Sequence, residues 1–174
     1  MARRRAPPNC RGVSLEMSPD PTVAAIVLAL AATAHNVEEM IWLPGFTHPP
    51  ALDLNVPARA FRFAAAGITL LFWVAALALA WGAAATAPVV AGFALAVIVN
   101  AFVPHLALTV ALRRYHPGTA SGLLLVVPAA LLYLASVDAL QHLRDPVFLA
   151  WAAAGAAGLA AAVPLLLALG RRLG

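Results

Sequence analysis

The residues best suited to chemistry in this chain are His35, Glu38 and Glu39, which lie together near the end of a long apolar stretch. At about 100° per residue along a helix, the three side chains lie at about 0°, 300° and 40°, on one face, with Trp42 one turn further along it. An imidazole and two carboxylates can bind Zn²⁺ or Fe²⁺, or can move protons as general base and acid. Because charge is costly at this depth, these side chains are expected to face a bundle interior or a polar cavity.

A second polar group lies in the third apolar stretch, which contains Asn100, Pro104 and His105. His35 and His105 each precede the end of their stretch by about eight residues, and the first and third spans run in the same direction, so the two histidines are expected at one depth. Pro104 cannot donate to the carbonyl of Asn100, which predicts a kink that frees this carbonyl. The kink would also help Asn100 and His105, about 140° apart on an ideal helix, to face one site.

The elements that position these residues are predicted to be transmembrane helices. Hydrophobic residues make up 63% of the 174, charged residues 10%, and the mean hydropathy is +0.90. A soluble domain has about 25% charged residues, so the composition predicts an integral membrane protein. Apolar runs of this length favour a single all-α domain, a polytopic bundle of about five helices. The helices are expected at about 21–43, 58–81, 89–112, 118–137 and 146–169.

Residues 1–20 are rich in Arg and Pro and are predicted to form a disordered tail. With this tail, the two sides of the membrane carry six and five arginines, which does not decide the orientation. If translation begins at Met17 instead, the count becomes six against one, because Arg144 is then alone on its side. The sequence therefore predicts an N-out, C-in orientation in the cell (plasma) membrane, and a mis-assigned start is left open. The six arginines are Arg59, Arg62, Arg113, Arg114, Arg171 and Arg172.

The basic charge of the chain does not indicate a nucleic-acid partner. The pI is about 10.6, but there is no Lys and the arginines lie near the predicted membrane edges, which is typical of headgroup anchoring. The single cysteine, Cys10, excludes an intrachain disulfide and a cysteine-based metal site. The expected partners are the lipid bilayer and a lipophilic small molecule.

Three short motifs in the right spans resemble those of the HXXEE-domain family of small integral membrane proteins. The resemblance covers most of the chain from residue 20 to 130. It implies no particular reaction, only that the polar residues of the motifs form a common site. The motifs are His35-x-x-Glu38-Glu39, Asn100-x4-His105 and Arg114-x-x-Pro117-Gly118, with Pro128 beyond them.

The predicted site residues fall into two groups. His35 and His105 would bind a metal (Zn or Fe) or shuttle protons, with Glu38 and Glu39 as metal ligand and general base. Further side chains are predicted to contact the substrate, among them cationic groups that suit an anionic headgroup. These are Asn100, Arg113, Arg114, Tyr115 and Trp42.

Several functions remain open at this point. The first hypothesis is a small metal- or carboxylate-dependent enzyme that hydrolyses, isomerises or cyclises a lipophilic substrate in the cytoplasmic leaflet. The second is proton-coupled transport, and the third is a non-catalytic lipid-binding or assembly subunit. The two carboxylates could instead belong to a structural ion-pair network with Arg62, Arg113 or Arg114. Gly118-x-x-x-Gly122 permits close helix packing and leaves a homodimer open.

Overall fold

The structure, a computed structural model, describes residues 19–46 and 56–173. In this part of the chain, five helical segments are long and apolar enough to cross a membrane, and no strand is present. The predicted all-α class is therefore confirmed, whereas the predicted tail lies almost wholly outside the described residues. The segments are α1 (Pro21–Trp42) with η1 (Leu43–Gly45); α2 (Ala58–Ala80); α3 (Thr86–Asn100) with η2 (Ala101–Leu106) and α4 (Ala107–Leu112); α5 (Thr119–Ser121) with η3 (Gly122–Val126) and α6 (Val127–Ser136); and, after η4 (Gln141–Arg144), α7 (Pro146–Arg172).

Two aspartates at one end of the bundle fix where α1 and α7 begin. Oδ1 of Asp20 accepts the backbone N–H of Thr22 at 2.7 Å, and Oδ1 of Asp145 accepts that of Val147 at 2.9 Å. Each aspartate is followed by a proline at the first helical position, where the missing N–H costs nothing. The third segment begins at Thr86, three residues before its expected start at 89, because a proline is equally tolerated in its first turn.

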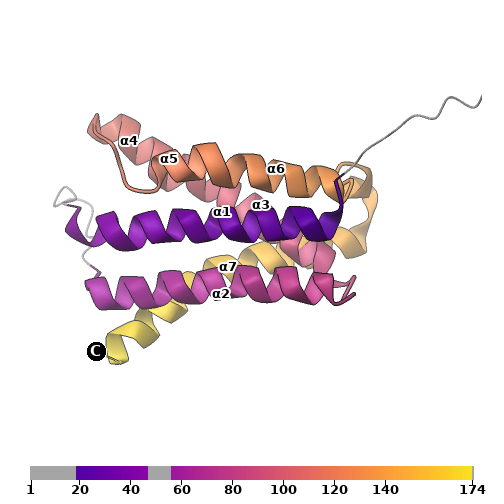
Figure 1. The fold of residues 1–174 in the computed structure, drawn as a ribbon, viewed down its shortest axis with the longest axis horizontal. Coiled ribbons are helices and arrows are strands. Elements are labelled where there is room, and N and C mark those ends of the chain that lie inside the picture. The colour runs from indigo at the N-terminus through magenta and orange to yellow at the C-terminus, as the bar shows by residue number, and fades with distance from the viewer. Residues whose placement is uncertain (1–18, 47–55, 174) are drawn as a thin grey trace, which may run out of the picture.

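The segments form two layers (Figure 1). α6, α1 and α2 lie side by side, and α3 and α7 cross behind them. The crossing of α3 and α7 brings their backbones together at two glycines. A Cβ on Gly92 would lie 2.0 Å from the carbonyl oxygen of Ala152, and one on Gly155 would lie 2.4 Å from that of Val89. Gly155 therefore serves packing within the chain.

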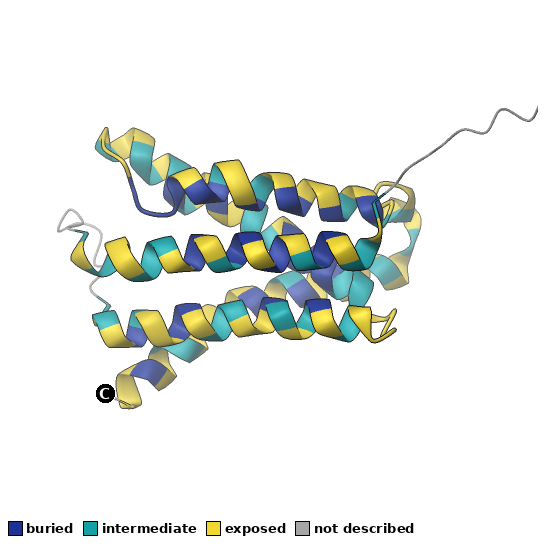
Figure 2. Cartoon of the chain, viewed as in Figure 1, coloured by how far each residue is buried: buried dark blue, intermediate teal, exposed yellow. Residues whose placement is uncertain are grey.

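Most buried apolar residues are alanines, and many large apolar side chains are exposed. Figure 2 shows buried and exposed positions alternating along the helices. Among the few large buried side chains, Leu28 and Tyr133 have no exposed surface, and the Tyr133 hydroxyl donates to the carbonyl of Ala87 at 2.9 Å. The outward residues of every segment include Leu or Val with more than half of their surface exposed, a pattern suited to a lipid environment. Examples are Leu70 (62%), Val110 (68%), Leu124 (73%) and Leu165 (68%).

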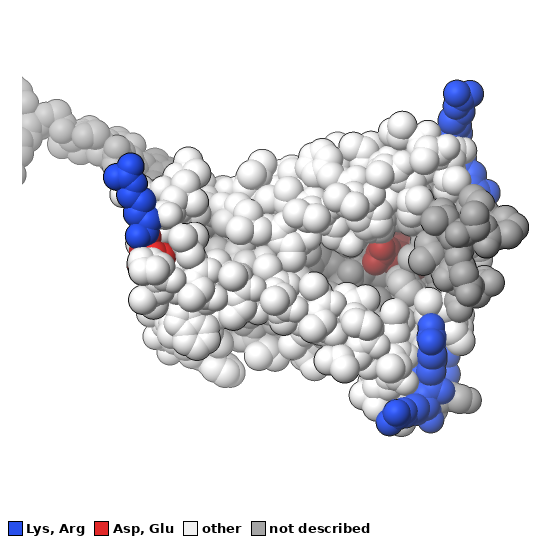
Figure 3. Space-filling model, turned by 180° about the vertical axis from the view of Figure 1, so that it is seen from behind, with Lys and Arg blue, Asp and Glu red and all other residues white. Residues whose placement is uncertain are grey.

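Charged side chains gather at the ends of the bundle. Figure 3 shows a face that carries basic atoms at its two ends and none along its middle. On the same face, acidic atoms lie at the bottom of a hollow, near the end with most of the basic side chains. A carboxylate is therefore accessible through an apolar surface rather than through the charged rim.

Candidate functional site

The last turns of α1 present the motif histidine and its carboxylates. His35 is 5% exposed, and its Nε2 lies 3.9 Å from Oε1 of Glu39, one helical turn further along. Asn36, which follows the motif histidine, contacts α2 instead of the histidine cluster. Nδ2 of Asn36 donates to Oγ1 of Thr69 at 2.8 Å, which ties α1 to α2. The helical register therefore directs His35 and Glu39 to one side of α1, where the third segment lies.

The irregularity expected at Pro104 takes the form of a π-helical stretch, η2. The backbone N–H of Ala107 donates to the carbonyl of Phe102, five residues back. Because proline lacks an N–H, a wider turn lets the helix pass it without ending. The changed winding also brings the side chains of Asn100 and His105 together, with Nδ2 and Nε2 at 3.1 Å.

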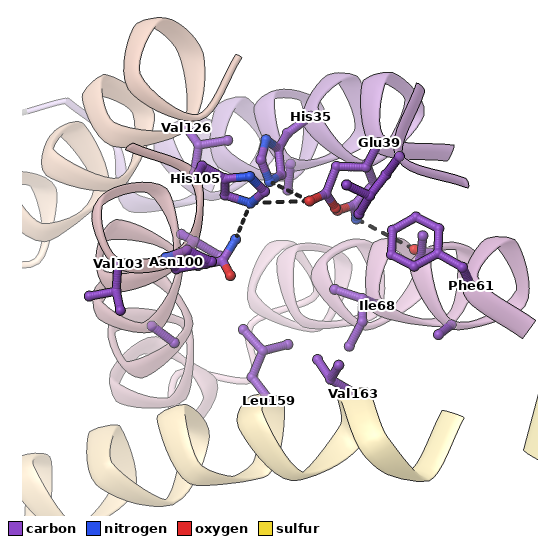
Figure 4. A pocket seen from close by; sticks show the side chains of 18 of the residues that line it. His35, Glu39, Phe61, Ile68, Asn100, Val103, His105, Val126, Leu159 and Val163 are labelled. Carbon is purple, nitrogen blue, oxygen red and sulfur yellow. Dashed lines mark hydrogen bonds and ion pairs between the residues drawn. The ribbon is translucent and has the colours of Figure 1, made fainter. Parts of the chain in front are cut away.

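The two segments meet at three side chains (Figure 4). Nε2 of His105 lies 3.1 Å from Oε1 of Glu39, and the rings of His35 and His105 stand edge to face with their centroids 4.9 Å apart. The expected contact between the first and third spans is therefore present. One ligand atom from each of the three residues lies within 4.8 Å of the others, so this set could hold a metal ion.

A tight turn between α4 and α5 orients the second histidine. The carbonyl oxygen of Pro117 lies 2.8 Å from Nδ1 of His105 and 3.0 Å from Nδ1 of His116. A carbonyl can only accept, so Nδ1 of His105 carries a proton, and Nε2 faces Glu39. The backbone N–H of His116 donates to Oγ1 of Thr109 at 3.0 Å, which holds the turn against α4.

Glycine is required in this turn for two separate reasons. Gly118 has φ +90°, which L side chains rarely adopt. A Cβ there would also lie 2.6 Å from Cε1 of His105 and 2.9 Å from Cε1 of His35. At Gly122, a Cβ would lie 3.6 Å from Cε1 of His35. That distance is an ordinary contact, so it is Gly118 whose lack of a Cβ makes room for the imidazole rings.

Glu38 is held by the same turn and lies apart from Glu39. Its Oε1 accepts the backbone N–H of Gly118 at 3.0 Å and the hydroxyl of Tyr115. The backbone N–H of Ala120 donates in turn to the Tyr115 hydroxyl at 3.2 Å. Partial burial, followed by the hydrogen bond to Glu38, raises the pKa of Tyr115 above its usual value. The two adjacent carboxylates thus have different partners.

Among the described residues, Glu39 contacts His35 and His105, and Glu38 contacts Tyr115, Gly118 and Ser121. These partners differ from the ion-pair network with arginines considered above. Nε of Arg62 donates to the carbonyl of Met40 at 3.2 Å. The guanidinium carbon of Arg114 lies 4.0 Å above the ring centre of Phe46. The positions of these cations near the helix ends, rather than beside the carboxylates, explain the difference.

Four of the five expected substrate contacts do not line the cavity described below. Trp42 is 64% exposed, so its side chain lies at the surface. Arg113 ends α4 in a left-handed conformation with φ 49°, and Arg114 follows it at the surface. Asn100 lines the cavity, and Tyr115 reaches the site through Glu38.

Sequence reasoning missed two side chains that orient the histidines. His116 is 3% exposed, and its Nδ1 lies 3.3 Å from Nδ1 of His105. Oγ of Ser121 lies 3.0 Å from Nδ1 of His35. Both residues lie within three positions of Gly118, so the Pro-Gly turn was the available signal for them.

A cavity of about 600 Å³ opens beside the cluster, between α1, α2, the third segment and α7. Figure 4 shows Leu159 and Val163 of α7 across the cavity from His35 and Glu39. One end of the cavity is polar, and the remainder is apolar. The polar lining residues are His35, Asn36, Glu39, Asn100, His105 and His116, and the apolar ones include Phe61, Ile68, Phe72, Val103, Val126, Leu159 and Val163.

Comparisons with known proteins match the part of the chain that builds this cluster. The profile of a family described as "Protein of unknown function with HXXEE motif" matches residues 26–133. A Bacillus subtilis (strain 168) protein named "Uncharacterized protein YrkK" is 35% identical over 101 residues, which are 56% of this chain and 64% of that protein. The chain therefore spans less than two thirds of the length of this curated relative. No solved structure matches the chain.

Proposed function

The chain belongs to the family of proteins with the HXXEE motif, and from this premise we propose that it is a membrane-embedded enzyme acting on a single-chain lipophilic molecule. One observation carries the proposal. Three buried or nearly buried polar side chains, His35, Glu39 and His105, converge at one end of an otherwise apolar cavity. Polar side chains within a membrane-spanning bundle are expensive and are kept mainly for function.

The shape and lining of the cavity support this class of substrate. A volume of about 600 Å³ lies within the usual range for small-molecule sites. The apolar part, with Phe72, Leu159 and Val163, suits a hydrocarbon chain, and the opposite end places a reactive group beside Glu39 and His105. The substrate class is therefore a hydrocarbon chain, acyl or isoprenoid, with one polar group at its end.

The polar end can support hydrolysis or proton-transfer isomerisation, including cyclisation. In hydrolysis, Glu39 accepts a proton from water while the water oxygen bonds to the substrate carbonyl carbon. The bond from that carbon to the leaving oxygen then breaks, and the proton passes to the leaving oxygen. In isomerisation, Glu39 takes a proton from one carbon and returns it to another. In both reactions, the amide of Asn100 is close enough to donate to the substrate oxygen, and Nε2 of His105 can accept a proton from water or from a substrate hydroxyl.

Occupation of the cavity is tested by photolabelling. Purified protein in detergent is irradiated with a hexadecanol that carries a diazirine and an alkyne, and labelling is measured with unlabelled hexadecanol as competitor. In Val163→Trp, the indole occupies the apolar end, and the apparent affinity is expected to fall about tenfold, a loss of about 1.4 kcal/mol. Leu165→Trp, two residues away and 68% exposed outside the cavity lining, is the matched control. Equal loss in both variants would reject the cavity as the binding site.

Turnover is tested by incubating the protein with extracted membrane lipids and analysing the mixture by mass spectrometry. Conversion of a lipid is expected in the wild type and is expected to fall about 100-fold or more in Glu39→Gln, the usual effect of losing a general base. Binding without conversion would support the alternative of a lipid-binding subunit. Movement of the unchanged molecule across a vesicle membrane, lost in the same variant, would support transport.

We also infer that the cluster lies nearer the cytoplasmic surface of the plasma membrane. The six arginines outside the tail that share one side lie at the start of α2, after α4 and at the end of α7, which meet at one end of the bundle (Figure 1), whereas Arg144 ends η4, before the start of α7 at the other end. Cytoplasmic loops carry such an excess of arginine, which corresponds to an N-out, C-in topology. Reporter fusions after Arg172 and within the loop before Ala58 would both be active on the cytoplasmic side.

A further inference from the structure

We propose that His35, Glu39 and His105 bind one divalent transition-metal ion, Zn²⁺ or Fe²⁺, and that Glu38 is not among its ligands. The inference deepens the proposed function, because it rests on the same site: Oε1 of Glu39 faces both histidines and would hold the ion, and Oε2 is left to accept a proton from water. The facing atoms are separated by 3.1 Å (His105 Nε2 to Glu39 Oε1) and 3.9 Å (His35 Nε2 to Glu39 Oε1). Ligands at about 2.0–2.2 Å from a tetrahedral ion lie about 3.4 Å apart, which is within this range.

The hydrogen bonds behind the two rings are those expected of metal ligands. Nδ1 of His105 donates to the carbonyl oxygen of Pro117 at 2.8 Å, and Nδ1 of His35 lies 3.0 Å from Oγ of Ser121. In metal sites, a ligating histidine usually donates its other ring N–H to such a partner, which fixes the tautomer and the ring orientation. Both Nε2 atoms then direct a lone pair toward Glu39.

This arrangement requires a positive charge at its centre. With its proton on Nδ1, His105 faces the carboxylate of Glu39 at 3.1 Å with an acceptor atom, and two acceptors repel at that distance. The amide Nδ2 of Asn100, 3.1 Å from the same Nε2, offsets the repulsion only in part. A proton on Nε2 of His105 would remove the repulsion between these two groups, whereas a cation bound by all three residues removes it and also engages His35, and Asn100 then releases Nε2.

The number and kind of the donors indicate the class of ion. Two imidazoles and one carboxylate leave further coordination positions toward the cavity, as in catalytic zinc sites and in non-haem iron sites. Glu38 is taken up by Tyr115 and Gly118, so the ion receives one carboxylate rather than two. Gly118 keeps the space beside both rings clear of a Cβ.

Metal binding is measured on the full chain, purified in detergent without a histidine tag, stripped with a chelator and dialysed. We expect one Zn²⁺ per chain by elemental analysis, and a d–d absorption band when Co²⁺ is used as the probe. His35→Ala, Glu39→Gln and His105→Ala should each weaken binding by more than about 100-fold, because even changes behind the ligands cost about 10- to 100-fold. Ser121→Ala should fall within that smaller range.

Glu38→Gln is the matched control, since it removes the same charge one residue away. It should weaken Zn²⁺ binding yet keep one ion per chain and an unchanged Co²⁺ band, whereas Glu39→Gln should lose the band. Circular dichroism and gel filtration in detergent verify that each variant is folded. A wild-type protein that binds no ion, or a band lost equally in both variants, would overturn the inference. Lipid conversion by metal-free protein would overturn it and leave the proposed function standing, whereas metal binding without occupation of the cavity would reject the function alone.

Discussion

Two turns at opposite ends of the bundle contain similar residues and differ in what they do. The turn from Arg113 to Gly118 and the connection from Asp138 to Asp145 each hold a histidine, an arginine and a non-glycine residue in the left-handed region, Arg113 at φ 49° and Asp138 at φ 47°. His116 in the first is 3% exposed, whereas the side chain of His142 in the second is 44% exposed.

The Pro-Gly pair accounts for this difference. Pro117 and Gly118 direct a carbonyl and an N–H into the bundle, toward His105 and Glu38. In the second connection, the polar side chains make contacts at the surface. The ring of His142 stacks on that of Phe148, with the ring centroids 4.6 Å apart. The comparison teaches that polar residue types in a loop indicate a site only when the backbone can fold back between the helices. The first two predictions below compare a part of the first turn with a counterpart at the other end, and the last tests a contact within the first turn.

The largest effect is expected for Gly118→Ala. Left-handed backbone costs an alanine about 1–2 kcal/mol, and the Cβ at 2.6 Å from the His105 ring adds overpacking of about 1–3 kcal/mol. The free energy of unfolding should therefore fall by about 2–5 kcal/mol, measured by denaturation in detergent micelles, and the histidine cluster should be displaced.

Gly82→Ala separates the two contributions at the other end of the bundle. Gly82 has φ +85°, close to that of Gly118, but a Cβ there meets nothing within 4 Å. Only the backbone cost of about 1–2 kcal/mol is expected. If both variants lost the same amount, the contact with the histidines would carry no energy, and the contrast between the turns would rest on conformation alone.

The two loop histidines provide the second prediction. His116→Ala removes a buried ring that lies against His105 and the carbonyl of Pro117, and should cost about 1–3 kcal/mol. His142→Ala removes an exposed ring 3.8 Å from Asp145, and should change stability by less than about 1 kcal/mol. Thermal unfolding of both variants tests this order, and a larger loss in His142→Ala would reverse the assignment of roles to the two turns.

Much of the fold could be predicted because hydropathy alone decides it. Apolar runs of about twenty residues leave helices as the only solution, and the matched depths of His35 and His105 followed from counting residues to the helix ends. The caps at Asp20 and Asp145 also agree with sequence rules. These features depend on local composition or on spacing along one helix.

The rest depends on contacts between distant segments. An ideal helix cannot indicate how the π-helical stretch re-aims Asn100 toward His105, because its winding is set by packing. Ideal helix geometry also placed Trp42 on the site face. In the structure, its side chain is 64% exposed and does not line the cavity. The separation of Glu38 from Glu39 follows from Gly118, which is 80 residues away in sequence.

The smallest expected effect comes from the contact between Tyr115 and Glu38. Tyr115→Phe removes one hydrogen bond at a half-exposed position and should lower the free energy of unfolding by about 0.5–1 kcal/mol at neutral pH.

The effect of Tyr115 on stability should also depend on pH. Because burial and this hydrogen bond raise the pKa of Tyr115, its contribution is complete below its ordinary pKa near 10 and is lost as the pH rises through the raised value. The wild type should therefore lose the advantage over Tyr115→Phe above about pH 10. Unfolding of both proteins in detergent at pH 8 and above pH 10 measures this. A pH-independent difference would mean that Tyr115 acts through packing, in which case His116, Pro117 and Gly118 would supply the polar contacts between this turn and the site.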